Sequence, residues 1–353
     1  MSAPAELTVE LIPASRCEAV DLRARLKEQF GAGLEAYRKA LYCSHHTTAG
    51  FVDRHVGSRL RHHGDLLDFI GAFQRLFPAN ADYEHDKLHL RTELSDEQKR
   101  TEPKNADSHL TFIGAGLHNC VTHETADELP VYLVDLDGIH EHGARRRKAS
   151  IVAYNEDRKV VTTEFEVPVS SHPVDSINLF DDEFGLAEQL DELVLRHGVE
   201  KGRLDLKLAD GEKDASVTVN EFETLLMQHD LREVLRNPLR FMKEKGRNIL
   251  RDPRTVPQKT LGYAQYDLVH VLNELMEAVG VSESILERLL ARLIALPASR
   301  LLSVRRSVSL LVSDEGNSAG KIVKGTYQSP ILMQWSKPAN SSRRLQASLV
   351  SFS

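Results

Sequence analysis

Two adjacent histidines, His45 and His46, follow a stretch from Ala36 to Tyr42 that predicts a strand. A neutral imidazole is the commonest metal ligand in proteins and a common general base near neutral pH. Because neighbouring strand residues point to opposite faces, we expect only one of the two rings to enter a given pocket. Taken alone, the pair is more typical of two exposed histidines at a polar strand end than of a functional site.

Two later stretches also place a histidine close to a carboxylate. His85 precedes Asp86, and Asp107 lies two residues before His109, which opens an apolar run. A carboxylate can orient an imidazole ring through a hydrogen bond, as it does around many metal ions. These two stretches shift the balance towards a functional site.

The stretches together resemble the signatures of the YjbQ-like family, whose members are often labelled secondary thiamine-phosphate synthases. Residues 46–49 (His-Thr-Thr-Ala) are similar to its His-Thr-Ser-Ala motif, and residues 83–86 (Tyr-Glu-His-Asp) match its second motif. Residues 105–109 resemble the third, in which a histidine opens a helix. Far downstream, residues 325–328 (Gly-Thr-Tyr-Gln) resemble its Gly-Thr-Trp-Gln, and residues 343–352 resemble its closing arginines and strand. The resemblance covers roughly the first third of the chain and its last few dozen residues.

The resemblance implies a metal-dependent site. It assigns His46, His85 and His109 as the metal ligands. Three nitrogen ligands with an open fourth position are typical of catalytic zinc, and imidazole suits zinc better than magnesium. The other assignments form two groups, Asp86, Asn105 and Asp107 as catalytic residues, and Thr47, Thr48, Gln328, Arg343 and Arg344 as substrate-binding residues. The two arginines would bind phosphate.

The function that the resemblance implies is a metal-dependent enzyme acting on a phosphorylated small molecule, with thiamine-phosphate synthase-like activity. That reaction joins a pyrimidine to a thiazole phosphate and releases pyrophosphate. The alternative is a non-catalytic YjbQ-like scaffold whose inserted domain binds a ligand or partner. Asp53 to His55 stand where the family carries an Asn-Glu-Asn patch, and Gln334 stands where it tends to carry glutamate. These departures favour the scaffold, whereas the retained histidines favour the enzyme. The family also implies a homotrimer.

The order of the signatures predicts how the chain is organised. We expect an α+β YjbQ-like domain built from residues 1–121 and 319–353, interrupted by an inserted, largely helical α+β domain at residues 122–318. Alternatively, strands near residues 131–154 close the family fold and the rest is an appended domain. Insertion is favoured because the Gly-Thr-aromatic-Gln motif occurs only near the C-terminal end.

Periodicity predicts several further elements. The apolar face of Asp65 to Phe77 indicates a helix. The other expected elements are a hairpin at 148–154 and 159–169 and helices at 184–197, 219–235, 266–279 and 284–293. Residues 210–221 place oxygens in the pattern of a calcium loop, but Ala215 stands where the sharp turn needs glycine. We therefore expect a charged turn before a helix there, and no calcium.

Composition limits the classes of partner. The chain has 353 residues, of which 41% are hydrophobic and 27% charged, as in ordinary globular domains. A formal net charge of -7 argues against a nucleic-acid partner. No apolar run is long enough to span a bilayer, so no membrane partner is expected. Three cysteines without paired spacing, and an N-terminus without a secretion signal, predict a reduced, cytoplasmic protein.

Overall fold

The computed structural model describes residues 2–31, 33–58, 60, 63–140, 143–236, 241, 305–314, 316 and 319–353. The protein is a mixed α+β chain that divides into two compact units. Unit 1 comprises residues 1–61, 117–222 and 305–353, and unit 2 comprises residues 62–116 and 223–304. Each unit is therefore assembled from segments that are far apart in the sequence.

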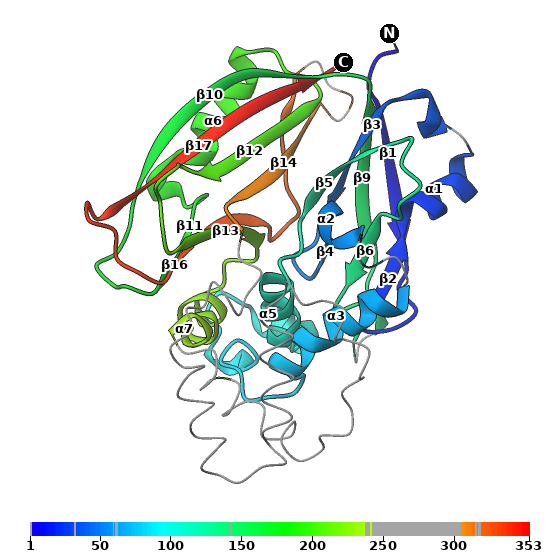
Figure 1. Ribbon diagram of the computed structural model, residues 1–353. Helices are drawn as coiled ribbons and strands as arrows, with labels where there is room; N and C mark the ends of the chain where they lie inside the picture. The colour runs from blue at the N-terminus through cyan, green and yellow to red at the C-terminus, as the bar shows by residue number, and fades with distance from the viewer. Residues whose placement is uncertain are drawn as a thin grey trace, which may run out of the picture. The chain divides into compact units, whose positions relative to one another are not determined.

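Unit 1 contains a four-stranded antiparallel sheet in the order β1-β9-β3-β5 (Figure 1). Its strands are β1 (Ala5–Leu11), β9 (Arg147–Tyr154), β3 (Lys39–Ser44) and β5 (Cys120–Glu124). Around it lie a β2-β6-β4 sheet, a β7-β8 ribbon and two helices, with bounds β2 (Glu18–Asp21), β4 (Ala49–Phe51), β6 (Tyr132–Asp135), β7 (Ile139–His140), β8 (Gly143–Ala144), α1 (Leu22–Phe30) and α2 (Arg54–Gly57). A buried cluster that includes Val9, Leu22 and Phe51 packs the four-stranded sheet against α1 and the β2-β6-β4 sheet.

Unit 1 also contains a five-stranded antiparallel sheet in the order β10-β17-β12-β14-β15 (Figure 1). Its strands are β10 (Asp157–Pro168), β17 (Ser342–Phe352), β12 (Gly202–Leu208), β14 (Ser307–Ser313) and β15 (Lys321–Val323). A three-stranded sheet, β11-β16-β13, and helix α6 complete this part, with bounds β11 (Asp175–Asn178), β13 (Ala215–Asn220), β16 (Ser329–Gln334) and α6 (Leu186–Arg196). Leucines from β12 and β17 and α6 residues such as Leu190 share one apolar core.

The C-terminal strands pair with the middle of the chain. β17 lies between β10 and β12, and β16 lies between β11 and β13. The C-terminal segment also meets the N-terminal region, because Phe352 stacks on Tyr154 with ring centroids 3.8 Å apart, and both join a buried cluster with Leu41 and Cys43 of β3. These contacts group residues 117–222 with both ends of the chain, whereas the sequence led us to expect residues 122–318 as one body.

Unit 2 is helical in its described part. It contains α3 (His63–Leu76), α4 (Asp96–Thr101), α5 (Ala106–Gly114) and α7 (Leu231–Arg236), with one-turn helices η2 (Leu88–Leu90) and η4 (Leu225–Asp230). The apolar face predicted for residues 65–77 is buried as expected, through Leu66, Phe69, Ile70, Phe73 and Phe77. None of the described helices is long and apolar enough to cross a membrane.

Several other predicted elements can be compared with the structure. The hairpin forms from β9 and β10, and the helix expected at 184–197 forms as α6. The helix expected at 219–235 is wrong at its start, because Val219 and Asn220 pair in β13 and the helical turns begin at Leu225. Likewise, the turn at 210–214 leads into β13 rather than into a helix. The helices expected at 266–279 and 284–293 lie outside the described residues.

Candidate functional site

The loop after β3 carries the first two histidines of unit 1. Strand β3 ends at Ser44, so the alternation of a strand no longer orients His45 and His46. The His45 Nε2 atom lies 2.9 Å from Ser150 Oγ, and the His46 Nε2 atom accepts a hydrogen bond of 2.7 Å from the Lys148 amide. Both rings therefore contact residues of β9.

Both loop histidines are uncharged at neutral pH. Burial, together with the charge of Lys148, lowers the pKa of His45 to about 4. Burial, and then the charge of Arg147, lowers the pKa of His46 to about 3. Because the His46 Nε2 atom accepts a hydrogen bond, the proton of the neutral ring is on Nδ1.

Gln328 holds this loop in place. Its Nε2 atom donates hydrogen bonds of 2.9 Å to the carbonyl oxygens of Ser44 and His46, while its Oε1 atom accepts one of 2.9 Å from the Gly325 amide. A Cβ atom at Gly325 would lie 1.9 Å from the His45 carbonyl oxygen, so only glycine fits there. The structure thus brings the Gly-Thr-Tyr-Gln segment beside the His-Thr-Thr segment within unit 1.

The two threonines assigned to substrate binding make contacts inside unit 1. The hydroxyl of Thr48 is buried and lies 3.3 Å from the Arg147 guanidinium, which also pairs with Asp135 at 2.6 Å. The carbonyl oxygen of Thr47 accepts a hydrogen bond of 3.0 Å from the Asn220 side chain. These contacts fix the loop, and the substrate-binding roles of the threonines stay a prediction.

The two arginines assigned to phosphate binding lie at the start of β17. Arg343 is buried and donates from its guanidinium to Glu212, Gln334 and two backbone carbonyl oxygens. Arg344 is exposed, and its guanidinium lies 4.0 Å from Glu212. Arg343 would have to give up these bonds to bind phosphate, whereas Arg344 faces solvent.

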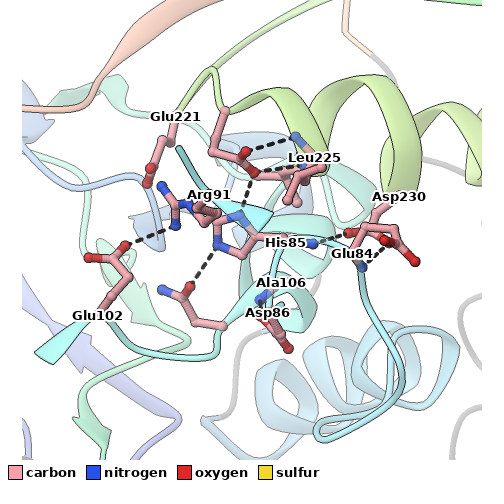
Figure 2. Close-up of polar contacts among 12 residues, drawn as sticks. Glu84, His85, Asp86, Arg91, Glu102, Ala106, Glu221, Leu225 and Asp230 are labelled. Carbon is pink, nitrogen blue, oxygen red and sulfur yellow. Dashed lines mark hydrogen bonds and ion pairs between the residues drawn. The ribbon is translucent and has the colours of Figure 1, made fainter. Parts of the chain in front are cut away.

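A second cluster lies in unit 2 around His85, whose side chain is fully buried. The His85 Nδ1 atom lies 2.8 Å from Glu223 Oε2, and its Nε2 atom lies 3.2 Å from Asn105 Oδ1 (Figure 2). Glu223 also accepts hydrogen bonds from the amides of Leu225 and Leu226 at the start of η4. Burial alone would raise the pKa of Glu223, but the bonds from His85 and the two amides outweigh it and lower the pKa.

Two further carboxylates fix the backbone of this cluster. Asp230 accepts hydrogen bonds of 3.0 Å from the amides of Glu84 and His85 (Figure 2). Asp86 accepts one of 3.1 Å from the amide of Ala106, the first residue of α5. Because the first amides of a helix have no partner within the helix, Asp86 satisfies one of them and positions α5.

Helix α5 brings the third predicted histidine beside His85. The ring of His109 is buried, with its centroid 5.3 Å from that of His85 and the two planes at 73°. Asn105 precedes α5 and Asp107 lies in its first turn, and both are buried. The structure therefore brings His109 and Asn105 beside His85, with Asp86 on the first amide of α5, and the catalytic roles of these residues stay a prediction.

The sequence did not point to Glu223 or Asp230, the two carboxylates that contact the segment of His85. The sequence predicted one helix over residues 219–235, which puts Glu223 inside that helix. In the structure Glu223 lies just ahead of the first helical turn, which begins at Leu225. An acidic residue just ahead of an apolar run such as Leu225 and Leu226 is a known signal of a helix N-terminus. That signal would have identified Glu223 as a capping residue, although not as the partner of His85.

The predicted zinc site has three histidine ligands, His46, His85 and His109. In the described parts of both units, no group of three or more His, Cys, Asp or Glu side chains is arranged to hold a metal ion. The two ring nitrogens of His85 face Glu223 and Asn105, so neither is open to a metal. His46 belongs to unit 1 and the other two histidines to unit 2. The three-histidine zinc site stays a prediction.

Comparisons with known proteins give structural neighbours only. No protein-family model matches the chain, and no curated protein matches it. A YbjQ-like protein of unknown function from Sulfolobus solfataricus P2 is similar at 14% identity and a TM-score of 0.28, covering 56% of this chain and 99% of that one. A hypothetical protein from Aeropyrum pernix K1 is similar at 16% identity and a TM-score of 0.27, covering 53% of this chain and 96% of that one.

A third similar structure is an uncharacterized conserved protein of the yjbq/upf0047 family from Clostridium acetobutylicum. It shares 12% identity at a TM-score of 0.23, and the match covers 54% of this chain and 99% of that one. The family that the sequence signatures resemble is thus present among the structural neighbours.

Proposed function

We propose that the chain is an enzyme that acts on a phosphorylated small molecule and uses His85 as a general acid. The observation that carries this proposal is the buried pair of His85 Nδ1 and Glu223 Oε2, 2.8 Å apart. A carboxylate on one ring nitrogen fixes the orientation of an imidazole and stabilises its protonated form. The same arrangement recurs in enzymes in which a histidine transfers protons.

The second ring nitrogen of His85 supports the same role. Its Nε2 atom faces Asn105 Oδ1, so oxygen atoms stand at both ring nitrogens. Two oxygen acceptors favour the doubly protonated ring, which is the form that donates a proton to a leaving group. Departing phosphate or pyrophosphate is such a leaving group, and protonation of its oxygen lowers the barrier to its release. Asn105 has to give way when a substrate oxygen takes its place.

The proposed reaction is the one implied by the family resemblance, in which a pyrimidine pyrophosphate joins a thiazole phosphate. The bond from the pyrimidine to pyrophosphate breaks as the bond to the thiazole forms, and pyrophosphate leaves. The proposed role of His85 is proton donation from Nε2 to the departing pyrophosphate. Glu223 keeps its charge because its pKa is lowered, and it balances the charge of the protonated ring. Asp230 and Asp86 hold the backbone of the His85 segment, so the ring is positioned before substrate arrives.

Replacing His85 should reduce turnover strongly. The assay is pyrophosphate release from a pyrimidine pyrophosphate and a thiazole phosphate, with phosphate release from a panel of phosphorylated small molecules beside it. We expect His85→Gln to lower kcat by about 10²- to 10⁴-fold with little change in KM, because only proton transfer is removed. The exposed His89 on η2 provides the matched control His89→Gln, which should retain full turnover.

Three outcomes of this experiment bear on the function. Full turnover by His85→Gln would reject the general-acid role. Absence of turnover by the unaltered chain across the panel would favour the non-catalytic scaffold. In elemental analysis of the same preparations, one metal ion per chain would support the predicted zinc site and reject the general-acid role, because a His85 ring that binds a metal cannot be doubly protonated.

A homotrimer is the proposed assembly, because it is the state that the YjbQ-like resemblance implies. Multi-angle light scattering should then give a mass of about three times the 39.6 kDa of one chain, unchanged on tenfold dilution. A single-chain mass over the same range would reject the trimer. The proposed location is the cytoplasm, in keeping with three cysteines that form no disulfide.

A further inference from the structure

The five-stranded sheet of unit 1 has one apolar and one polar face. Along β12, Leu204, Leu206 and Leu208 are fully buried in the core, while Arg203, Asp205 and Lys207 point to the other face. The neighbouring strands continue this polar face. Asp205 lies opposite Ser348 of β17 and Ser309 of β14. A sheet face that carries hydroxyls and charges in register faces water or a polar ligand.

This polar face forms one wall of a cleft of about 580 Å³. The other wall comes from the four-stranded sheet and α2, through residues such as Lys39 and Thr122. The lining contains five basic side chains, Lys39, Arg54, Lys159, Arg203 and Lys207, and three acidic ones, Glu124, Asp157 and Asp205. The difference of five and three leaves a formal charge of +2, in a chain whose net charge is -7. The cleft is therefore suited to an anion.

The carboxylates of the cleft hold some of its cations in place. Asp157 lies 2.7 Å from Lys39 Nζ and 3.6 Å from Arg203. Asp205 lies 3.0 Å from Arg203 and accepts a bond of 2.6 Å from the Ser309 hydroxyl. Lys207 and Lys159 are exposed at the opening, where Lys207 has only the exposed Asp210 as an ion-pair partner among the described residues. The inner charges are thus fixed, and the outer lysines can turn to a ligand.

A buried hydroxyl lies next to the lining residues. The side chain of Tyr154 is fully buried, and its hydroxyl has no hydrogen-bond partner with good geometry among the described residues. Burial raises the pKa of this hydroxyl to about 12. Arg203, Thr122 and Asp157, which line the cleft, lie close enough to shift the same pKa. A buried hydroxyl without a partner of good geometry is costly, and Thr122 and Arg203 of the lining lie near enough to supply one.

We propose that this cleft binds a phosphorylated polyol or sugar. Its basic side chains would bind the phosphate, and its carboxylates and serine hydroxyls would accept and donate hydrogen bonds to ligand hydroxyls. Its volume is in the range of small-molecule sites. The lining has no aromatic ring and no large apolar side chain, so it offers no surface for stacking a base. A nucleotide therefore fits less well than a sugar phosphate.

The inference is independent of the role of His85. All lining residues belong to unit 1, whereas His85 and Glu223 belong to unit 2. Binding in the cleft needs no proton transfer, so it is measured without turnover. The His85→Gln variant should bind the ligand as the unaltered chain does, which separates the two proposals.

Titration calorimetry on the full chain tests the site. The probes are glycerol phosphate, ribose 5-phosphate, glucose 6-phosphate and an inositol phosphate, with glucose, inorganic phosphate and AMP as comparisons. We expect at least one phosphorylated polyol or sugar to bind with a Kd of about 1 mM or tighter, and at least tenfold more tightly than each comparison. Higher salt should weaken that binding, because the phosphate contacts are electrostatic.

Variants at the opening of the cleft locate the binding. Lys159→Ala with Lys207→Ala should weaken it by about tenfold or more, because both lysines would contact the phosphate. Both side chains are exposed, so the fold should tolerate their loss. The matched control is Lys27→Ala on α1, another exposed lysine outside the cleft, which should change nothing. The proposal is overturned if none of the probes binds, if inorganic phosphate binds as tightly as its esters, if AMP binds best, or if the double variant binds normally.

Discussion

Lowering the pH from about 7 to about 4.5 is expected to destabilise unit 1 by an amount on the order of 5 kcal/mol. The cause is a set of histidines that are neutral when folded. Burial, followed by nearby cations, lowers the pKa of His45 to about 4, of His46 to about 3 and of His123 to about 4. In the unfolded chain each ring would titrate near its ordinary pKa of about 6.5.

The direction of this effect follows from proton binding. Between the unfolded and folded pKa values, the unfolded chain binds more protons, so protons favour unfolding. The stabilising contribution of each neutral ring is fully present above about pH 6.5 and is lost as the pH falls towards its folded pKa. One pKa unit corresponds to about 1.4 kcal/mol. Three rings together would give about 8 kcal/mol at pH 4.5, and the partial contact of His45 and His46 with water reduces this.

Urea unfolding followed by Trp335 fluorescence measures this loss, because Trp335 is the only tryptophan and belongs to unit 1. Most of the loss should appear above about pH 4.5. Carboxylates with a lowered pKa, such as Asp157, lose their contribution only below their ordinary pKa of about 3.9. A stability that stays level between about pH 7 and about pH 5 would contradict the prediction.

His123 allows a sharper form of this test. Its ring is buried against Tyr42, and neither ring nitrogen has a hydrogen-bond partner among the described residues. We expect His123→Leu to stabilise unit 1 by about 1 to 2 kcal/mol at neutral pH, since it removes unsatisfied polar atoms. The same change should reduce the loss in acid by about half, because the fully buried His123 ring contributes about 2.7 of the expected 5 kcal/mol. The exposed His172 gives the control His172→Leu, which should leave the pH dependence as it was.

Local patterns were enough to predict parts of the fold and of the site. The helix at 65–77 has a clear apolar stripe, and the structure buries that stripe. The signatures placed Gln328 and His46 in one predicted site, and the Gln328 side chain donates hydrogen bonds to the Ser44 and His46 carbonyl oxygens, while the substrate-binding role of Gln328 stays a prediction. Both cases rest on information carried by short segments.

The strand pairings and polar contacts that the sequence did not predict depend on contacts between distant segments. The pairing of β17 with β10 and β12 joins strands that are over a hundred residues apart, and nothing in the local pattern of β17 selects these partners. The Glu223 partner of His85 lies 138 residues away in the sequence, at the start of a turn that single-sequence periodicity assigned to a longer helix. Tertiary pairing of this kind decides which polar residues meet, so local patterns identified His85 but not its carboxylate.

Replacing Glu223 with alanine is expected to give the largest loss of stability of any single change in unit 2. Glu223 is 5% exposed and makes three hydrogen bonds, to His85 Nδ1 and to the amides of Leu225 and Leu226. Removing one member of a buried charged pair costs about 3 to 5 kcal/mol, because the other is left without compensation. Loss of the capping bonds at η4 adds about 1 kcal/mol. Urea unfolding followed by circular dichroism of the helices measures the total.

The comparison of three further variants shows whether the cost comes from the pair. Glu223→Gln keeps one acceptor oxygen but loses the charge, so it should cost less than Glu223→Ala. In Glu223→Ala combined with His85→Ala, no unpaired imidazole remains, so the double variant should be more stable than the sum of the two single losses predicts by about 2 kcal/mol or more. Glu233 on α7 is exposed, and Glu233→Ala should change stability by less than about 0.5 kcal/mol. Strict additivity in the double variant would show that His85 and Glu223 do not stabilise each other, and would remove the observation on which the general-acid role of His85 rests.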